Sequence, residues 1–381
     1  MTRMTFSRLT ALLGATLLVA ACEQGVGPAT KGGPAMSAAL APVAPGTPIA
    51  LDQWNGTMNE QNVSVIAKGF NPTNPHVGDA VVVSFFFPGS TNLITSVSDF
   101  VTDANHTPVG NAFHLVEFVT SGGISMATYV ASNVQGFPDP NPDPTVVYAV
   151  QATLSQPVSD AGIMVSAWTG ADAVSGQPVG AHRSGVASAA TAVTVDAGSI
   201  PLGAGALAYA VTMGSPVAGT SPPAGFTNLT NQSDALLKAD GETELLANAG
   251  SVDPQWLWGF QAQGTALASV LALNPAPHLA FTAQPKTTLP LMTIPPVQVT
   301  VTDASGNPVT TFSGPVTIAI GHNGGLVAAG TLSGTRTVNA VNGVATFSDL
   351  SIDQPGNGYT LVVSTGGVVS AESAPFNIGA F

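Results

Sequence analysis

Residues 296–320 read PVQVTVTDASGNPVTTFSGPVTIAI, and this stretch decides the fold class of the last hundred residues. The valines at alternate positions 297–301 are separated by Gln and Thr, which is the period of a strand with one buried and one solvated face. The DASGN that follows, 303–307, favours a tight turn. An Asp side chain can accept turn N–H groups, and Gly306 tolerates a positive φ. The stretch therefore predicts strands at 297–303 and 315–321, with a tight turn directly after the first.

Five further strands are expected around these two, and Asn342-Gly343 is a strong two-residue hairpin signal among them. The strands expected are 279–284, 297–303, 315–321, 334–340, 343–349, 358–365 and 368–378. Together these segments resemble a bacterial immunoglobulin-like repeat of extracellular proteins, which implies a seven-stranded Ig-like sandwich over residues 278–381. The Cys…Trp…Cys pattern of disulfide-linked antibody domains is not found there.

Residues 48–274 contain ten or more short apolar runs separated by Gly, Pro, Asn and Asp. The clearest are 80–87, 112–120, 124–132, 145–154, 162–168, 189–195, 205–213, 242–249, 256–263 and 267–273. This pattern predicts an all-β, two-sheet sandwich. In their order, and in the turn residues that separate them, the runs resemble jelly-roll-like surface modules of bacteria. A short helix is an alternative only at 234–246, where Gly241 interrupts it, and Asn274–Pro277 marks the expected domain boundary.

One nine-residue pattern, V-T-D-A-x-x-x-P-V, occurs at 101–109 and again at 301–309. The flanking sequences do not support duplication of a whole domain. We interpret both copies as the same local solution, in which a strand is followed by an Asx turn and then by a Pro that limits further pairing.

The N-terminus predicts export. Arg3 and Arg8 precede an uncharged apolar run that ends at Cys22, which is the order of a secretory signal peptide over residues 1–21. Val19-Ala20-Ala21-Cys22 resembles the lipobox of bacterial lipoproteins, which implies that Cys22 is lipid-modified. The alternatives are an ordinary cleaved signal peptide and a buried small cysteine. Residues 22–47 are rich in Gly, Ala and Pro and are expected to form a flexible linker. Glu23 favours the outer membrane or cell surface.

Composition restricts the partners. The chain has 381 residues, of which 21 are acidic and 8 basic, for a net charge of −13. Removal of Arg3 and Arg8 with the signal peptide would leave 6 basic residues and a charge of 6 − 21 = −15. So acidic a protein is not expected to bind nucleic acid, and an acyl chain rather than the protein surface would hold it at a membrane.

A weak calcium candidate is the Pro-rich loop at 137–144, where Asp139, Asn141 and Asp143 offer oxygen ligands. The alternating prolines favour an extended spacer loop instead. No other metal site and no cofactor is expected.

The tryptophans are candidates for stacking on a sugar ring. Trp256 and Trp258 share one face of an expected strand, and the alternative is that they pack in the core. The only candidates for paired catalytic carboxylates are Glu242 and Glu244, near Asp240, and a solvated strand face is the alternative for them.

These patterns predict a non-enzymatic, lipid-anchored protein of the cell envelope that displays β-sandwich modules for adhesion, envelope structure or ligand binding. A glycan or a surface protein is the expected partner. The alternatives are a polysaccharide-active enzyme, favoured if Glu242 or Glu117 is buried with a raised pKa facing a groove, and a carbohydrate-binding protein.

Overall fold

The computed structural model describes residues 48–379 except 140–142 and 144, so the expected signal peptide, Cys22 and the linker lie outside the described residues. Every helix or strand assigned within the described residues is a β-strand, which confirms the predicted all-β class. None of these residues forms a helix that could cross a bilayer.

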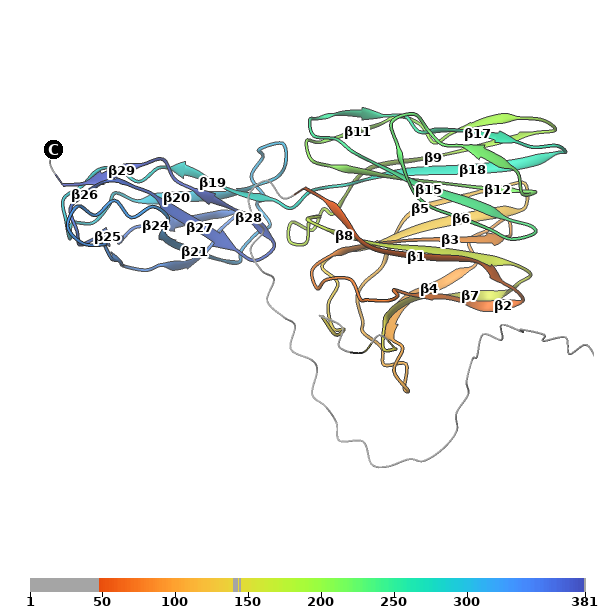
Figure 1. Cartoon of the computed structure of the whole chain (residues 1–381), viewed down its shortest axis with the longest axis horizontal. Helices are drawn as coiled ribbons and strands as arrows, with labels where there is room; N and C mark the ends of the chain where they lie inside the picture. Colours follow the sequence, from red (N-terminus) through yellow and green to blue (C-terminus); the bar gives the residue numbers. More distant parts are fainter. Residues whose placement is uncertain (1–47, 140–142, 144, 380–381) are drawn as a thin grey trace, which may run out of the picture. The chain divides into compact units, whose positions relative to one another are not determined.

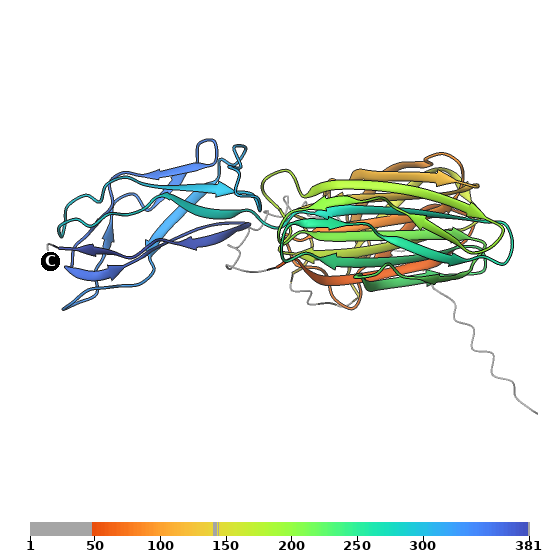
Figure 2. The same cartoon turned by 90° about the horizontal axis from the view of Figure 1, so that it is seen from above.

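Residues 48–274 form four layers, visible one above another in Figure 1. The first central sheet has the order β1 (Ala50–Glu60), β8 (Ala161–Thr169), β3 (Ala80–Pro88), β6 (Ile124–Ala131), β5 (His114–Ser121). The second has the order β14 (Thr227–Ser233), β15 (Lys238–Leu245), β12 (Leu207–Ser215), β18 (Gly264–Leu273), β9 (Val179–Ala189). Seen from above, the strands of the stacked layers run in broadly the same direction (Figure 2), as in aligned sheet packing.

Smaller outer layers cover the two central sheets. The first outer layer is β2 (Val63–Gly69), β7 (Tyr148–Val158), β4 (Ile94–Val101). The second consists of β10 (Val193–Asp196), β17 (Gln255–Gly259), β13 (Gly219–Ser221), beside the pair β11 (Ile200–Leu202) and β16 (Gly250–Val252).

Strand β3 shows why this stack forms. Val81, Val83 and Phe85 pack against the first outer layer, whereas Val82 and Phe86 pack against the second central sheet. A strand that is apolar on both faces must be covered on both faces. The expected two-sheet sandwich therefore differs from the structure in the number of layers. Residues 80–87 (AVVVSFFF) do not alternate between apolar and charged side chains, because sheets cover both faces of their strand.

The second central sheet has one large-residue face and one small-residue face. Leu207, Tyr209 and Val211 of β12 face the first central sheet, and Ala208 and Ala210 face the outer layer. The segment 234–246, where a short helix was the alternative, contributes β15 instead.

Residues 278–379 form a separate core around one seven-stranded sheet. Its order is β23 (Thr337–Asn339), β21 (Pro315–Ile320), β27 (Leu361–Thr365), β28 (Val368–Glu372), β19 (His278–Ala283), β20 (Val297–Thr302), β24 (Val344–Phe347). Two short pairs accompany it, β22 (Leu332–Ser333) with β25 (Ser351–Ile352), and β26 (Gly356–Tyr359) with β29 (Phe376–Ile378). Each of the seven expected segments contains a strand, and the valines of β20 are buried as their alternation predicts. The expected solvated face is wrong in part, because Gln298 is exposed but Thr300 and Thr302 are buried.

Both copies of the repeated nine-residue pattern form the same turn. Asp103 Oδ1 accepts the N–H groups of Asn105 and Thr107 at 3.2 and 2.8 Å, and Asp303 Oδ1 accepts those of Ser305 and Asn307, both at 2.9 Å. The fourth turn position has φ +47° at His106 and +83° at Gly306. The predicted Asx turn is confirmed at both places.

Candidate functional site

The structure places Trp256 and Trp258 in the core, both 0% exposed. Their rings lie on the alanine face of the second central sheet, and a Cβ added at Gly214 would lie 2.6 Å from the ring of Trp258. Each indole N–H is used internally. Trp256 Nε1 donates to Glu242 Oε2 at 2.8 Å, and Trp258 Nε1 donates to Thr212 Oγ1 at 3.1 Å. These two rings therefore offer no surface on which a sugar could stack.

Glu242 is 1% exposed, and burial raises its pKa to about 7 despite the hydrogen bond from Trp256. The charge of Asp240 raises this pKa further, and Lys238 lowers it. A raised pKa suits a general acid. However, Glu242 is buried beneath Trp256 and therefore cannot contact a polysaccharide. Glu117, the other carboxyl considered, pairs instead with His182 Nδ1 at 2.5 Å.

The Pro-rich loop gives its two described carboxylates different partners. Asp143 Oδ1 accepts from Thr145 Oγ1 at 2.7 Å and from Thr145 N at 2.9 Å, and these hydrogen bonds, the hydroxyl's above all, lower the Asp143 pKa. Asp139 Oδ2 accepts from Val77 N at 2.8 Å. Asn141 lies outside the described residues. Asp139 therefore belongs with a second group of acidic side chains near Val77.

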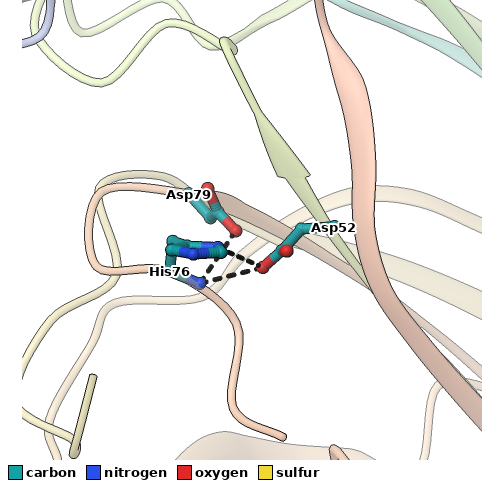
Figure 3. Close-up of side chains that lie close together, drawn as sticks. All are labelled: Asp52, His76 and Asp79. Atoms are coloured by element: carbon teal, nitrogen blue, oxygen red, sulfur yellow. Dashed lines mark hydrogen bonds and ion pairs between the residues drawn. The ribbon is translucent and has the colours of Figure 1, made fainter. Parts of the chain in front are cut away.

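That group is Asp52 on β1 with His76 and Asp79 on the β2–β3 loop (Figure 3). Their potential ligand atoms lie within 4.8 Å of one another. His76 N donates to Asp52 Oδ2 at 2.9 Å and to Asp79 Oδ2 at 3.2 Å. His76 Nδ1 lies 3.0 Å from Asp52 Oδ2. Two carboxylates and an imidazole are side chains that can coordinate a divalent cation.

Asp79 is the buried member of the cluster, only 4% exposed. Burial raises its pKa to about 9, helped by the hydrogen bond and the charge of Asp52 and by the charge of Asp139. With no cation present, Asp79 therefore keeps its proton at neutral pH.

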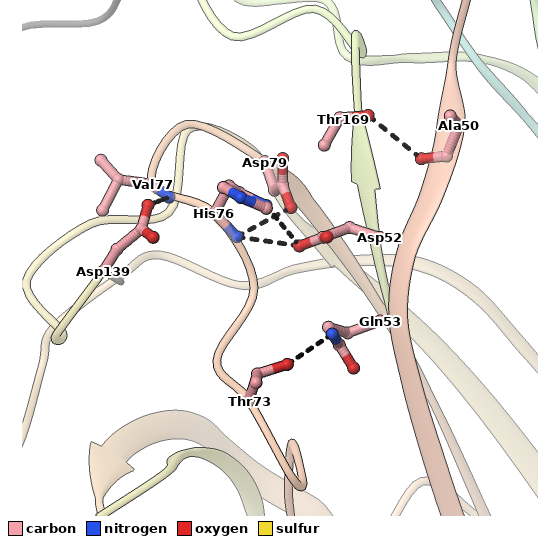
Figure 4. Close-up of polar contacts among 9 residues, drawn as sticks. All are labelled: Ala50, Asp52, Gln53, Thr73, His76, Val77, Asp79, Asp139 and Thr169. Carbon is pink, nitrogen blue, oxygen red and sulfur yellow. Dashed lines mark hydrogen bonds and ion pairs between the residues drawn. The ribbon is translucent and has the colours of Figure 1, made fainter. Parts of the chain in front are cut away.

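Further contacts hold the loop around this cluster against β1 (Figure 4). Gln53 Nε2 donates to Thr73 Oγ1 at 2.6 Å, beside the contact of His76 with Asp52. Near the start of β1, Thr169 Oγ1 of the neighbouring strand β8 donates to the carbonyl of Ala50 at 3.4 Å, which is a contact between the two strands. Sequence reasoning missed the cluster because its members are brought together by strand pairing. The only local signal is the spacing of His76 and Asp79, which places both in one turn.

A groove of about 630 Å³ opens where the two central sheets meet along one side. It lies between β1 and the pair β14 and β15, and Trp54, 42% exposed, is its aromatic wall. A groove of about 470 Å³ lies on the opposite side, between β5 and β9, and includes His114 and His182.

Comparison with protein-family models finds no match to this chain, and comparison with curated proteins finds no significant similarity.

Proposed function

We propose that this protein is a lipid-anchored binding protein of the bacterial cell envelope, attached through Cys22 at the outer membrane or cell surface, and not an enzyme. The lipobox-like signal supports the anchor, and the Gly- and Pro-rich residues 22–47 would space the folded part from the membrane. The part that resembles an Ig-like repeat would serve as a second displayed module.

One observation carries the binding assignment. The carboxyl group best suited to catalysis, Glu242, is closed inside the core, whereas a groove of ligand size is open beside Trp54. Pockets of 300–1,000 Å³ are typical of small-molecule sites. The residues available to an external molecule are therefore those of a recognition surface.

A polysaccharide-active enzyme is the second candidate, because the pKa of Glu242, raised to about 7, is what an acid catalyst needs. This candidate requires the Trp256 layer to open. Release of reducing ends from a polysaccharide panel, lost in Glu242→Gln, would support the enzyme and contradict our proposal.

Intact mass and membrane partitioning of the native protein, beside Cys22→Ser, test the anchor. We expect acyl mass on residue 22 of the wild type, and a variant that is unprocessed or soluble. Wild-type protein released without modification at Cys22 would contradict the anchor.

A further inference from the structure

The groove at Trp54 lies along a seam between two sheet edges. β1 ends the first central sheet, and β14 ends the second. Each edge strand has a sheet neighbour on one side only, so side chains along the seam have no strand beyond them. The residues that form the groove are Leu51, Trp54, Trp168, Leu207, Gly225, Thr227, Asn228, Leu229, Thr243, Glu244 and Leu245.

Exposed apolar side chains line both sides of the groove, Leu51 and Trp54 on β1 and Leu245 on β15. Trp54 is exposed to 42%, and Leu51 and Leu245 are similarly exposed. The other three tryptophans of the chain are all buried. A large aromatic ring grouped with two leucines in a groove is typical of a binding surface rather than of scattered exposed residues.

The side of the groove formed by β14 and β15 also carries polar groups that the fold does not use. Among the described residues, the side chains of Thr227, Thr243 and Glu244 make no hydrogen bond, whereas Asn228 bonds to Glu242. The Glu244 carboxylate lies over Gly225, where an added Cβ would be 3.3 Å from Oε1. The hydroxyl groups of Thr227 and Thr243, which are paired in register, therefore remain available to a ligand on the face directed toward the first central sheet, whereas Glu244 pairs with Ala208 and projects from the outer-layer face.

We propose that this groove binds a neutral oligosaccharide, with a sugar ring on Trp54 and sugar hydroxyls hydrogen-bonded to Thr227 and Thr243. A sugar ring presents an apolar C–H face and a rim of hydroxyl groups, which matches the indole of Trp54 and the hydroxyl groups of the two threonines. The carboxylate of Glu244 and the net charge of −13 disfavour an acidic polysaccharide. The inference deepens the proposed binding function and rests on it.

The test uses the full-length protein in detergent and titrates it with cellohexaose, laminarihexaose, mannohexaose and chitohexaose. Tryptophan emission reports binding, because Trp54 is the one exposed tryptophan among the four in the chain. We expect saturable binding of at least one hexaose. Trp54→Ala should weaken it roughly tenfold or more, whereas Trp54→Phe, which keeps an aromatic ring, should weaken it much less. Calorimetry measures affinity in the variants that lack the indole.

Thr243→Val should weaken binding of the same hexaose several-fold, because it removes a hydroxyl group that can both donate and accept a hydrogen bond. Val186→Ala is the matched control, since Val186 is an exposed apolar residue of β9 on the opposite side, and it should leave affinity unchanged. No binding of any hexaose, equal binding by Trp54→Ala, or tighter binding of hexagalacturonate would overturn the proposal. Loss of hexaose binding with acylation at Cys22 intact would reject the groove alone. Binding without acylation would reject the anchor alone.

Discussion

Trp54 and Trp258 show how one residue type serves two purposes in this fold. Trp258 belongs to β17 of the outer layer, its ring packs against the alanine face of the second central sheet, and its N–H donates to Thr212. Trp54 lies on the edge strand β1, and the ring is left 42% exposed in a groove. Coverage by a further layer, rather than residue type, decides which tryptophan stabilises the fold and which is available to a ligand.

Removing the two rings should change the free energy of unfolding by very different amounts. Trp258→Ala is expected to lower the free energy of unfolding by about 3–5 kcal/mol, because it leaves a large cavity over Gly214. Trp54→Ala should change it by less than about 1 kcal/mol, because the ring is half in solvent. Denaturant unfolding measures both. Similar losses for the two variants would contradict the comparison.

The same contrast applies to carboxyl groups. Asp79 is buried with its pKa raised to about 9, so the folded state holds a proton that the unfolded chain loses near pH 4. Its contribution to stability is therefore greatest at low pH and is lost as pH rises from about 4 to about 9. Asp79→Asn should gain about 1–3 kcal/mol at pH 9 relative to wild type, because the amide cannot ionise.

Thermal unfolding between pH 4 and pH 9, in a metal chelator, measures this difference. Val186→Ala is the control, since Val186 is an exposed apolar residue of β9, and because this variant removes no titratable group its pH profile should follow that of wild type. A flat wild-type profile, or an Asp79→Asn profile as steep as that of wild type, would contradict the account.

Glu242 should show a smaller effect of the same sign. Its pKa of about 7 means that stability falls as pH rises from about 4.5 to about 7. Glu242→Gln keeps an oxygen that accepts the indole N–H of Trp256 and removes the charge. We expect it to be more stable than wild type by about 1 kcal/mol at pH 8 and to match it at pH 4.5. Chemical denaturation at the two pH values measures the difference, and a variant destabilised equally at both would refute the assignment.

The smallest effect is expected at the repeated turn. His106 and Gly306 occupy the same left-handed position in the two copies. His106→Gly should stabilise the chain by a few tenths to about 1 kcal/mol, and Gly306→Ala should destabilise it by about 1 kcal/mol, because only glycine adopts a positive φ without strain. Equilibrium unfolding would decide, and stabilisation by Gly306→Ala would be the contrary result.

Local patterns predicted the strands and the turns. The alternation at 297–301 and the Asx turns at Asp103 and Asp303 are set by neighbouring residues, so the sequence contains them. The number of layers was not predicted, because an apolar run such as AVVVSFFF shows that both faces are covered but not by what. The positions of Trp54 and of the Asp52, His76 and Asp79 cluster depend on β1 being an edge strand paired with β8, which is a long-range choice.

Acrylamide quenching of tryptophan emission in the wild type and in Trp54→Phe tests the central contrast most directly. The account predicts that one accessible class of tryptophan is quenched in the wild type and disappears in the variant, while the remaining emission resists quenching. Unchanged quenching in Trp54→Phe would show that Trp54 is not the exposed ring, and would contradict the account.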